Sequence, residues 1–538
     1  MFEQYVDNLS EMDEIFPQGK VFRIVFDNTV AKFRILARDY YDLEKIIMSF
    51  SVSNESAFFS KQYGFKAEDR LYSVNKFGFF SIGLIFEIFD YIKSQYGTLD
   101  VIAMSQNAKQ FLITFLMPLK DFIRRHDRDS FEVNNVSSKI QMRDYQINAI
   151  KALLFDGYGR GLVELPTGSG KSFFIANFIY TLWKQYDSSL KTLIYVPNRQ
   201  LVDQFYTDLL DYGFNKEDLT KLTAGLKKDE KYDPDAKIII ANRQYLFKNK
   251  EKLPRIDVLV CDEAHQCADY KSVTYQFIEQ LNAKIKIGCS GTLPRDKFKK
   301  WSLIGLFSKI LYTENIVALQ NQGYLANVKL TVFNINDTTV SNNRNISFNE
   351  DSYQKYVEGG DIAFNQSYSD ELEYMNKNCM NLYEKVLDYL KDQQGNTLVL
   401  FDRIEFGKAL HESISSKCEG KTVYYIDGSV KPEYREEVRK NVELNDNIII
   451  VAQTATTSTG VNFKNLRRIM FSFQTKSTTQ IVQSIGRSLR LHKDKDFSEI
   501  IDVVFQFKYS KKHFDERKRI YKEFYNIKKA DKVIQIEI

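Results

Sequence analysis

Short apolar runs alternate with amphipathic helical patterns along two long stretches of the chain. Apolar runs bounded by polar residues predict buried strands, and their alternation with helices predicts parallel sheets covered on both faces. We therefore expect two tandem α/β domains, at residues 138–312 and 313–538. The expected strands are residues 161–165, 192–196, 237–241, 257–261 and 286–290 in the first domain, and 397–401, 422–426, 447–451 and 468–472 in the second.

Residues 1–137 show a different pattern, that of a small α+β domain. Residues 61–80 interleave lysines with aromatics, a composition found both on DNA-binding surfaces and on solvated faces over an aromatic core. The charged segment 124–138 has the character of a linker. Residues 334–349 are rich in Asn, Ser and Thr and predict an exposed loop, part of an insertion at 334–372. The expected elements of the small domain are strands 21–26 and 32–36 and helices 41–50 and 81–95.

Composition changes this picture little. The chain of 538 residues needs more than one core, and its net charge of +5 permits nucleic-acid binding without requiring it. The five cysteines form no CxxC pair, which favours buried thiols in a reducing compartment over a zinc site. No apolar run approaches the ~20 residues of a membrane span, and the first residues lack a signal-peptide pattern. We therefore expect a cytoplasmic protein. The richness in Lys, Asn, Tyr, Phe and Ile suits an AT-rich viral genome, and for a viral protein the cytoplasm would be that of the host.

A glycine-containing loop follows the strand at 161–165 and leads into a helical pattern. Such a loop turns successive backbone N–H groups toward phosphate oxygens, and the helix N-terminus adds partial positive charge. We expect Lys171 to reach the β- and γ-phosphates of ATP and the Ser172 hydroxyl to ligate Mg²⁺. Leu165 stands where the general pattern has glycine. The loop residues expected to bind ATP are Pro166, Thr167, Gly168, Ser169, Gly170, Lys171 and Ser172.

Two adjacent carboxylates end the expected strand 257–261. A carboxylate in this position can hold Mg²⁺, and a second one can orient and deprotonate the attacking water. We assign Asp262 to the metal and Glu263 to the water. Parallel strands present their carboxyl ends at one crevice, so this pair is expected near Lys171.

The second α/β stretch contains two arginines three residues apart on an expected helix. Arginine stays charged and forks onto phosphate oxygens, so Arg487 and Arg490 are expected to neutralise charge that develops on the γ-phosphate, with Gln483 beside them. No such arginine is apparent in the first half. The ATP site is therefore expected to need both halves of the chain.

In this order along the chain, these segments resemble the motifs of superfamily 2 helicases of the DEAH-box type. The resemblance implies two RecA-like domains and an ATP hydrolase coupled to strand separation. It implies that Gln146 reads adenine, that Gly460 contacts the nucleotide, and that Ser290-Gly291-Thr292 couples nucleotide state to strand binding. Asn198 and Asn242 stand where the family usually has a hydroxyl. The residues that the resemblance implies as nucleic-acid contacts are Pro197, Arg199, Gln204, Thr223, Gly225, Gln244, Phe401, Gly428, Thr457 and Ser458.

In the small domain an aromatic strand pair, a helix and a Lys/aromatic stretch are followed by Phe77-Gly78-Phe79-Phe80-Ser81-Ile82-Gly83-Leu84, and this order resembles the accessory domain of the phage UvsW helicases. That resemblance implies DNA as partner, as a fork, Holliday junction or R-loop. It also implies roles in recombination, repair and replication restart, 3′-to-5′ movement, and recombination or single-strand-binding proteins as further partners. A monomer is expected.

Three other functions are compatible with these motifs. The first is an RNA helicase, although the accessory C-terminal domains of large DEAH RNA helicases are not apparent. The second is the motor subunit of a restriction or repair nuclease, which would need a partner because no nuclease motif is evident. The third is a binding module without ATP turnover, against which the intact loop, acidic pair and arginines weigh.

Overall fold

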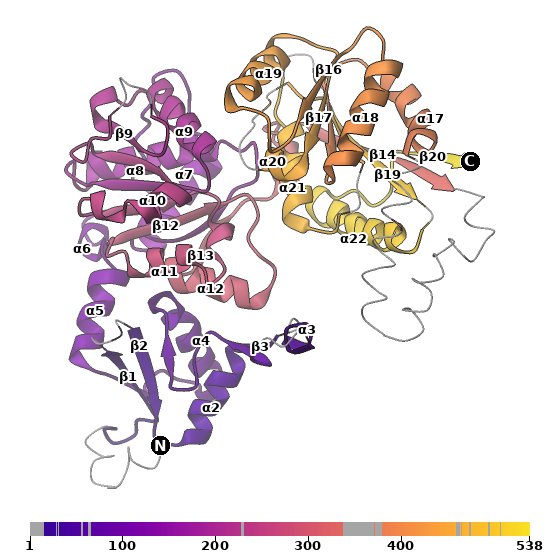
Figure 1. Cartoon of the computed structure of the whole chain (residues 1–538). Coiled ribbons are helices and arrows are strands. Elements are labelled where there is room, and N and C mark those ends of the chain that lie inside the picture. Colours follow the sequence, from indigo (N-terminus) through magenta and orange to yellow (C-terminus); the bar gives the residue numbers. More distant parts are fainter. Residues whose placement is uncertain are drawn as a thin grey trace. The chain divides into compact units, whose positions relative to one another are not determined.

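The computed structural model shows two compact units, residues 1–165 with 171–313 and residues 166–170 with 314–538. Figure 1 gives the order of the elements along the chain. The residues that the structure describes are 16–27, 30, 32–54, 57–62, 66–226, 231–336, 371, 379–458, 463, 465–472, 475–492, 495, 497–505 and 507–537.

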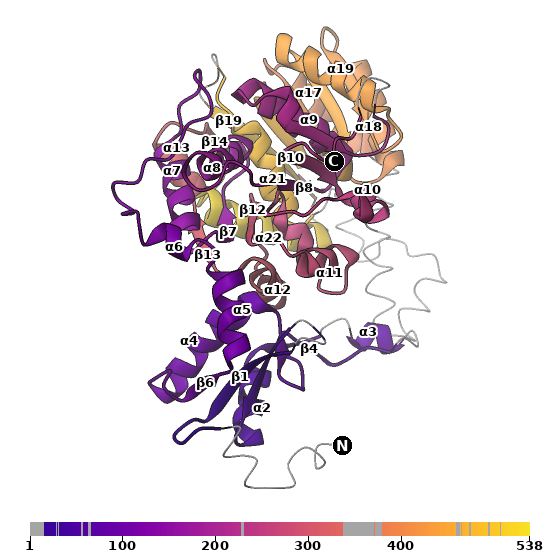
Figure 2. The same ribbon diagram turned by 90° about the vertical axis from the view of Figure 1, so that its left-hand side faces the viewer.

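The first unit contains a parallel sheet, with strand order β13-β7-β12-β11-β8-β10-β9 in its described residues. Its central strands are continuous apolar runs, such as Ile-Ile-Ile-Ala in β10, because helices cover both faces and leave no side for water. Helices α8 to α11 surround it (Figure 2). The strands are β7 (Arg160–Glu164), β8 (Thr192–Val196), β9 (Leu219–Leu222), β10 (Ile238–Asn242), β11 (Val258–Cys261), β12 (Ile285–Ser290) and β13 (Ile310–Thr313).

The helices of this part begin mostly with polar caps. Asn198, Ser272 and Asp296 each accept a hydrogen bond from a backbone N–H of the first turn, which satisfies donors that a helix start leaves open. The helices are α7 (Asp144–Lys151), η3 (Ala152–Asp156), α8 (Lys171–Gln185), α9 (Arg199–Tyr212), η4 (Lys216–Asp218), α10 (Arg243–Lys248), η5 (Lys250–Lys252), η6 (Ala264–Cys267), α11 (Val273–Gln280) and α12 (Lys297–Phe307).

The N-terminal part of the same unit has a small mixed sheet of order β5-β2-β1-β6. β1 pairs antiparallel with β2 and parallel with β6, and a short β3–β4 ladder lies apart from them. The elements are β1 (Phe22–Asp27), β2 (Lys32–Ala37), α2 (Tyr40–Ser49), β3 (Ser51–Ser53), α3 (Ala57–Gln62), β4 (Arg70–Tyr72), β5 (Phe79–Phe80), η2 (Ile82–Leu84), α4 (Ile85–Tyr96), β6 (Ile102–Met104), α5 (Gln106–Leu116) and α6 (Lys120–Ile123).

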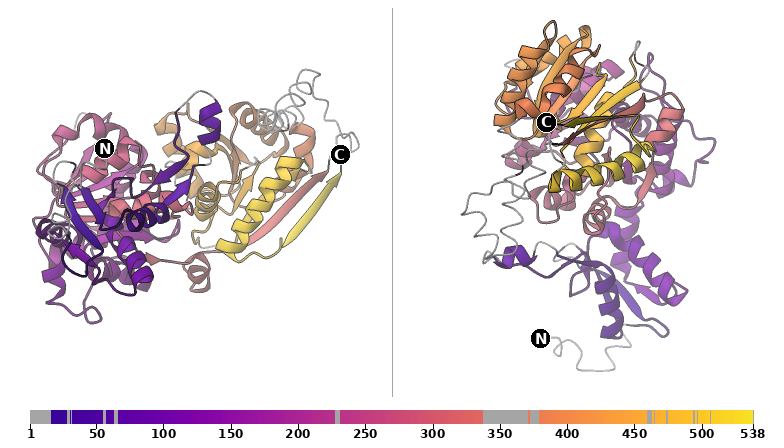
Figure 3. Two further views of the ribbon diagram at one scale, coloured as in Figure 1. Left: turned by 90° about the horizontal axis from the view of Figure 1, so that it is seen from below. Right: turned by 90° about the vertical axis from the view of Figure 1, so that its right-hand side faces the viewer.

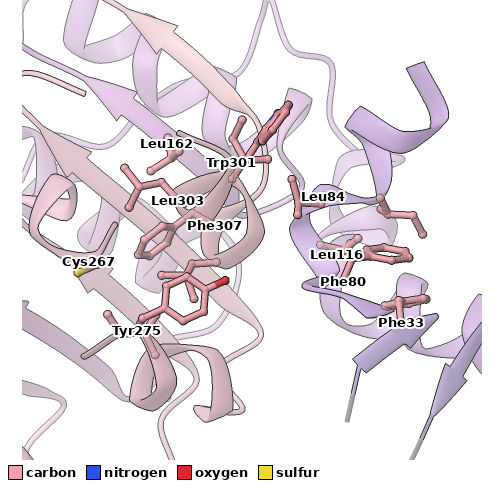
Figure 4. Packing of buried hydrophobic residues seen from close by; sticks show 14 of the residues in the cluster. Phe33, Phe80, Leu84, Leu116, Leu162, Cys267, Tyr275, Trp301, Leu303 and Phe307 are labelled. Atoms are coloured by element: carbon pink, nitrogen blue, oxygen red, sulfur yellow. The ribbon is translucent and has the colours of Figure 1, made fainter. Parts of the chain in front are cut away.

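This small sheet packs onto the large one through α12, and the two form one continuous apolar cluster. Figure 4 shows Leu84 and Phe80 on one side of the junction, and Trp301 and Phe307 on the other. The approach is closest at Gly83, where an added Cβ would lie 1.9 Å from the carbonyl oxygen of Ile304. Only a residue without a side chain fits there, so the sequence of η2 is adapted to this docking.

A polar cluster accompanies this apolar contact. The Ser81 hydroxyl lies 3.0 Å from the Tyr275 hydroxyl and donates to Glu279 Oε1 at 2.5 Å. Lys32 Nζ lies 3.3 Å from the same Glu279 oxygen. A buried hydroxyl that lacks a hydrogen bond lowers the stability of the fold. The hydrogen bonds of this cluster therefore also fix the orientation of the small sheet on α11.

The second unit contains another parallel sheet, ordered β16-β17-β15-β18-β19-β14-β20 among its described strands. Its core gathers the inward side chains of these strands with those of α17 and α18. The strands are β14 (Asn327–Asn336), β15 (Thr397–Phe401), β16 (Thr422–Ile426), β17 (Ile448–Gln453), β18 (Arg468–Phe471), β19 (Phe497–Phe505) and β20 (Lys532–Glu537). The helices are α13 (Ile316–Asn321), α17 (Cys379–Lys391), α18 (Ile404–Lys417), α19 (Pro432–Leu444), α20 (Thr454–Ser458), α21 (Thr478–Ser488) and α22 (Lys508–Tyr525).

The α/β fold with two parallel sheets and a small N-terminal mixed sheet is confirmed, but several strands were not expected. Residues 334–336, expected in a loop, end β14, while the rest of the 334–372 insertion lies outside the described residues except residue 371. β19 was missed because Glu499 and Asp502 interrupt its apolar pattern. Both are buried and paired, with Arg468 and Arg517 respectively. The strands absent from the expectation are β3, β4, β5, β6, β9, β13, β14, β19 and β20.

Segment 124–138 was wrongly interpreted as a linker. Phe131 is buried and meets the Phe155 ring edge-on at 5.2 Å, and the Val136 N–H donates to Asn177 Oδ1 at 2.8 Å. The segment is irregular because its backbone bonds to side chains of α8 instead of to a ladder. Its charged residues face outward while Phe131 anchors it.

Candidate functional site

The loop of residues 166–170 connects β7 to α8 and has the backbone of a phosphate-binding turn. Gly168 and Gly170 have φ of +87° and +81°, a left-handed conformation that glycine adopts without strain. The Ser169 N–H donates to the Pro166 carbonyl at 3.1 Å and closes the turn. α8 starts at Lys171, so the loop delivers the chain to a helix N-terminus, where anions are stabilised.

Lys171 and the acidic pair lie together in the first unit. Lys171 Nζ is 4.0 Å from Glu263 Oε1, and both side chains are largely buried. Glu263 has a φ of +51°, which is uncommon for a residue with a side chain and costs backbone energy. Such strain persists only where the surroundings impose it, and here it turns the Glu263 carboxylate toward the lysine. The strand end brings Asp262 into the same place, 5% exposed.

Burial changes the proton affinity of these groups. It raises the pKa of Asp262 to about 7, and the neighbouring Glu263 charge adds to the rise while Lys171 opposes it. Burial also lowers the pKa of His265, with Glu263 acting in the opposite direction. Burial therefore disfavours the charged form of Asp262 more than Lys171 favours it, and a further cation beside Asp262 would favour that charged form.

His265 links the acidic pair to the end of the next strand. Its Nδ1 lies 2.9 Å from the Ser290 hydroxyl and 3.4 Å from Glu263 Oε2. The Ser290 hydroxyl also donates to the Thr292 carbonyl at 2.9 Å. A change at Glu263 can therefore reach the loop after β12 through one imidazole, although nothing in the spacing of the sequence had indicated that contact.

Gln146, expected to read adenine, is 2% exposed. Its Oε1 accepts a hydrogen bond from the Arg143 N–H at 3.0 Å and caps the start of α7. The cap fixes the direction of the side chain. The adenine contact itself stays a prediction.

The residues expected to contact nucleic acid in the first unit follow the carboxyl ends of β8, β9 and β10. Asn198, in place of the usual hydroxyl, caps α9 by accepting from the Leu201 N–H at 3.1 Å. Arg199 Nη2 donates to the Gly225 carbonyl at 2.8 Å, which joins two motifs that are 26 residues apart. Gly225 has a φ of +67°, and a Cβ there would meet the Arg199 guanidinium at 2.5 Å.

Three buried side-chain oxygens at this edge have no hydrogen-bond partner among the described residues. They are Thr223 Oγ1, Asn242 Oδ1 and Thr292 Oγ1. Each comes from a different strand end, β9, β10 and β12. Unpaired buried polar atoms cost free energy, so their recurrence along one edge points to a ligand that pairs with them. Of the other residues expected to contact nucleic acid here, Pro197 is buried, Gln204 is half-buried and Gln244 is exposed.

In the second unit, Phe401 is not available as a contact, contrary to our expectation. Its side chain is fully buried, stacks on Tyr425 at 5.5 Å and fills the space beside Gly407. Gly428 is exposed in a turn held by Asp427, whose Oδ1 accepts from the Ser429 N–H at 2.9 Å. Thr457 and Ser458 lie in α20, and Gly460 lies outside the described residues.

The two arginines do not share a helix, which corrects the sequence-based interpretation. α21 carries Gln483 and Arg487 and ends at Ser488, so Arg490 follows the helix. Lys495 Nζ donates to the Ser488 and Arg490 carbonyls and fixes this helix end. Burial lowers the pKa of Lys495 to about 7.

A buried ion pair holds the opposite end of α21. Arg517 on α22 binds Asp502 on β19 through two hydrogen bonds of 2.8 and 2.9 Å, and both side chains are fully buried. Arg517 Nη1 also donates to the Thr475 carbonyl at 3.0 Å, just before α21 begins. No motif in the sequence marks α22, so this support for the arginine-bearing helix was missed.

The donor set suits a divalent metal of the magnesium type. Asp262 Oδ1 is buried without a hydrogen-bond partner among the described residues, and carboxylate and hydroxyl oxygens are what Mg²⁺ prefers. The Ser172 hydroxyl lies 2.9 Å from the Tyr212 hydroxyl, which orients it. Tyr212 is a further residue that the motif pattern did not reveal.

Known proteins resemble this chain in two regions. Residues 139–295 match the family described as type III restriction enzyme, res subunit, and residues 380–492 match the helicase conserved C-terminal domain. The ATP-dependent DNA helicase uvsW of Enterobacteria phage T4 is 28% identical over 395 residues, 72% of this chain and 73% of that protein. The DNA 3′-5′ translocase XPB2 of Sulfurisphaera tokodaii is 24% identical over 70% of this chain and 84% of its own length.

A solved structure shares the fold. The ATP-dependent type ISP restriction-modification enzyme LlaBIII bound to DNA aligns with a TM-score of 0.53 at 14% identity, over 84% of this chain and 36% of that one. At this identity the likeness concerns the fold alone. Among the described residues, no helix of this chain combines the length and apolar character needed to cross a bilayer.

Proposed function

We infer from the two family matches that the chain is an ATP-dependent helicase of superfamily 2, and we propose that it moves on DNA and remodels branched DNA such as forks, Holliday junctions and R-loops. The observation that carries the ATPase part is the cluster of Lys171, Glu263 and Asp262 at the carboxyl edge of the first sheet. We assign phosphate binding to Lys171, the attacking water to Glu263 and the metal to Asp262 with Ser172.

We further propose that ATP hydrolysis requires residues from both units. The first unit supplies the phosphate lysine, the acid pair and the oriented Ser172 hydroxyl. The second supplies Arg487 and Arg490, held by α22 and Lys495. Arginine keeps its charge when it is partly buried, so the two arginines suit the γ-phosphate as its charge develops. Asp262 and the Ser172 hydroxyl would hold Mg²⁺, which would supply positive charge against the phosphates.

The DNA track is proposed along the carboxyl edge of the first sheet. Thr223 and Thr292 carry buried hydroxyls without hydrogen-bond partners among the described residues there, and Arg199 lies beside Gly225 on the same edge. The exposed Arg199 guanidinium and the two threonine hydroxyls can donate to phosphate oxygens without regard to sequence. His265 connects this edge to Glu263, which supports coupling between nucleotide state and strand binding.

We also propose three domains, at residues 1–137, 138–312 and 313–538. The first of them would be an accessory DNA-binding domain. Its β5 turn carries an exposed aromatic between two cations. Phe77 is 45% exposed, Lys76 Nζ lies 5.2 Å from its ring, and Arg34 Nε donates to its carbonyl at 2.9 Å. Asn75 Oδ1 accepts from the Phe77 N–H and fixes the turn. A rigid aromatic beside cations suits stacking on an opened base.

The name of the T4 relative supports DNA as the track, and the DEAH-type acidic pair leaves RNA as the alternative. The test compares ATP turnover and unwinding on a fork, a Holliday junction, an R-loop, plain duplex DNA and single-stranded RNA, with Lys171→Ala as the inactive control. We expect branched DNA to give the highest turnover and unwinding. Stimulation by RNA alone would overturn the proposal, and equal activity on plain duplex would remove the branched-DNA part of it.

A further inference from the structure

The second unit contains a cavity of about 730 Å³ away from the motif residues described above. β14 and the edge strand β20 form one wall, and α22 with residues 527–530 forms the other. Figure 3 shows the yellow helix α22 running beside the β14 and β20 strands. None of the residues assigned to the ATP site or to the DNA track lines this cavity, so those roles do not account for it.

The base of the cavity is apolar. β14 and β20 are in register there, with Val332 opposite Val533, and β19 adds one further side chain from the same face of the sheet. Val533 remains 55% exposed, which is unusual for an aliphatic residue on a sheet face. The apolar side chains that line the cavity are Leu330, Val332, Val504, Phe514, Ile527 and Val533.

The rim is strongly basic. Its cations are Lys511, Lys518, Arg519, Lys522, Lys528 and Lys529, whereas Asp515 is the one carboxylate among the lining residues. Lys518 pairs with Asp515 at 2.6 Å, and Arg519 pairs with Glu516 at 2.9 Å. For the other four lysines, no carboxylate in the described part of the chain lies within 4.0 Å. Like charges around one cavity repel each other, so this arrangement favours an anionic occupant.

The walls are held in place before any ligand binds. The buried Arg517–Asp502 pair anchors α22 to β19, and the Tyr521 hydroxyl donates to Asp502 at 2.7 Å. At the start of β20, the Leu330 N–H donates to Asp531 Oδ2 at 2.8 Å, and the Asp531 N–H donates back to the Leu330 carbonyl. A ligand would therefore bind a formed site and lose little free energy to ordering it.

We propose that this cavity docks an acidic peptide segment of a protein partner, with an apolar side chain on the base and carboxylates against the rim lysines. The basic rim indicates that the occupant carries negative charge. The aliphatic base indicates that the occupant also carries an apolar side chain. A nucleic-acid backbone would use the lysines but would leave Val533 and the strand side chains uncovered. A peptide with both features uses the whole cavity, and this site would tether the motor to a partner independently of the ATP site.

The test measures binding of a short fluorescein-labelled peptide, rich in Asp and Glu with one Leu and one Phe, to the full chain by anisotropy. Control peptides replace the acids by Lys, or the Leu and Phe by Ala. The rim variant is Lys522→Glu/Lys528→Glu, and the base variant is Val533→Asp. Lys532→Glu is the matched control, because Lys532 points to the other face of β20, where its Nζ lies 5.0 Å from the Tyr389 ring.

We expect the affinity for the peptide to fall about tenfold or more in the rim and base variants, and to weaken as the salt concentration rises. Lys532→Glu should bind the peptide like the parent chain, and ATP turnover without DNA should be unchanged in all variants. Both control peptides should bind at least about tenfold more weakly than the parent peptide. Equal peptide affinity in the parent and rim variant would overturn the proposal. If the rim variant instead lost affinity for a single-stranded oligonucleotide by the same factor as for the peptide, the cavity would be a nucleic-acid site and the peptide assignment would be wrong.

Discussion

The buried pair of Arg517 and Asp502 gives the sharpest stability prediction. Both side chains are fully buried, with two hydrogen bonds between them and a third from Arg517 to the Thr475 carbonyl. Arg517→Met leaves the Asp502 carboxylate in an apolar interior with only the Tyr521 hydroxyl as a partner. Removing one member of such a pair costs about 3–5 kcal/mol, because the remaining charge is no longer compensated.

For a domain the size of the second unit, this loss corresponds to a decrease of about 6–20 °C in melting temperature. The measurement is thermal unfolding followed by circular dichroism and calorimetry. Arg519→Met on the same helix is the matched control, because its ion pair with Glu516 is exposed to solvent and contributes at most about 1 kcal/mol. A double change, Arg517→Met with Asp502→Leu, should recover part of the loss. If Arg517→Met melted within a degree or two of Arg519→Met, the buried pair would not support α21 as we describe.

Three further predictions concern other parts of the chain. In Gly83→Val the new Cβ would lie 1.9 Å from a carbonyl oxygen of α12. We therefore expect the free energy of unfolding to fall by about 1–3 kcal/mol or more and the small domain to be proteolysed faster; unchanged proteolysis and melting would refute the docking. Burial lowers the pKa of His513 to about 4. The unfolded chain then binds more protons between pH 6.5 and 4, so stability falls as pH decreases through this window, and His513→Gln should flatten the urea-midpoint profile while exposed His492→Gln should not. Phe77→Ala should weaken fork binding about five- to tenfold in a gel-shift titration, against little change for Tyr41→Ala, although Tyr41 is the more exposed aromatic; equal effects would argue against base stacking at the β5 turn.

The sequence predicted most of the strands and helices whose apolar pattern is regular. Fully apolar runs such as residues 192–196 and 397–401 became strands with those bounds, because no polar residue interrupts them. Prediction failed where burial depends on a distant partner. Glu499 and Asp502 look like surface residues in a linear pattern, and only the fold shows that Arg468 and Arg517 neutralise them inside the sheet.

The candidate site shows the same division. The motif order located Lys171, Asp262 and Glu263, and the structure brings these residues together at one strand edge. The contacts that orient them come from residues without a motif of their own, such as Tyr212 against Ser172, and could not be read from spacing. Phe401 failed for the converse reason, because a motif position and a core position are indistinguishable until packing is known.

The central claim is that Glu263 activates water in an ATP site that begins at Lys171. Its most direct test is steady-state ATP turnover with saturating branched DNA in Glu263→Gln, together with nucleotide affinity measured by a fluorescent ATP analogue. We predict that turnover falls by about 10²–10⁴-fold while the nucleotide still binds, because the amide keeps the shape of the carboxylate but cannot accept the proton. Turnover within twofold of the unmodified chain would contradict the assignment of the site.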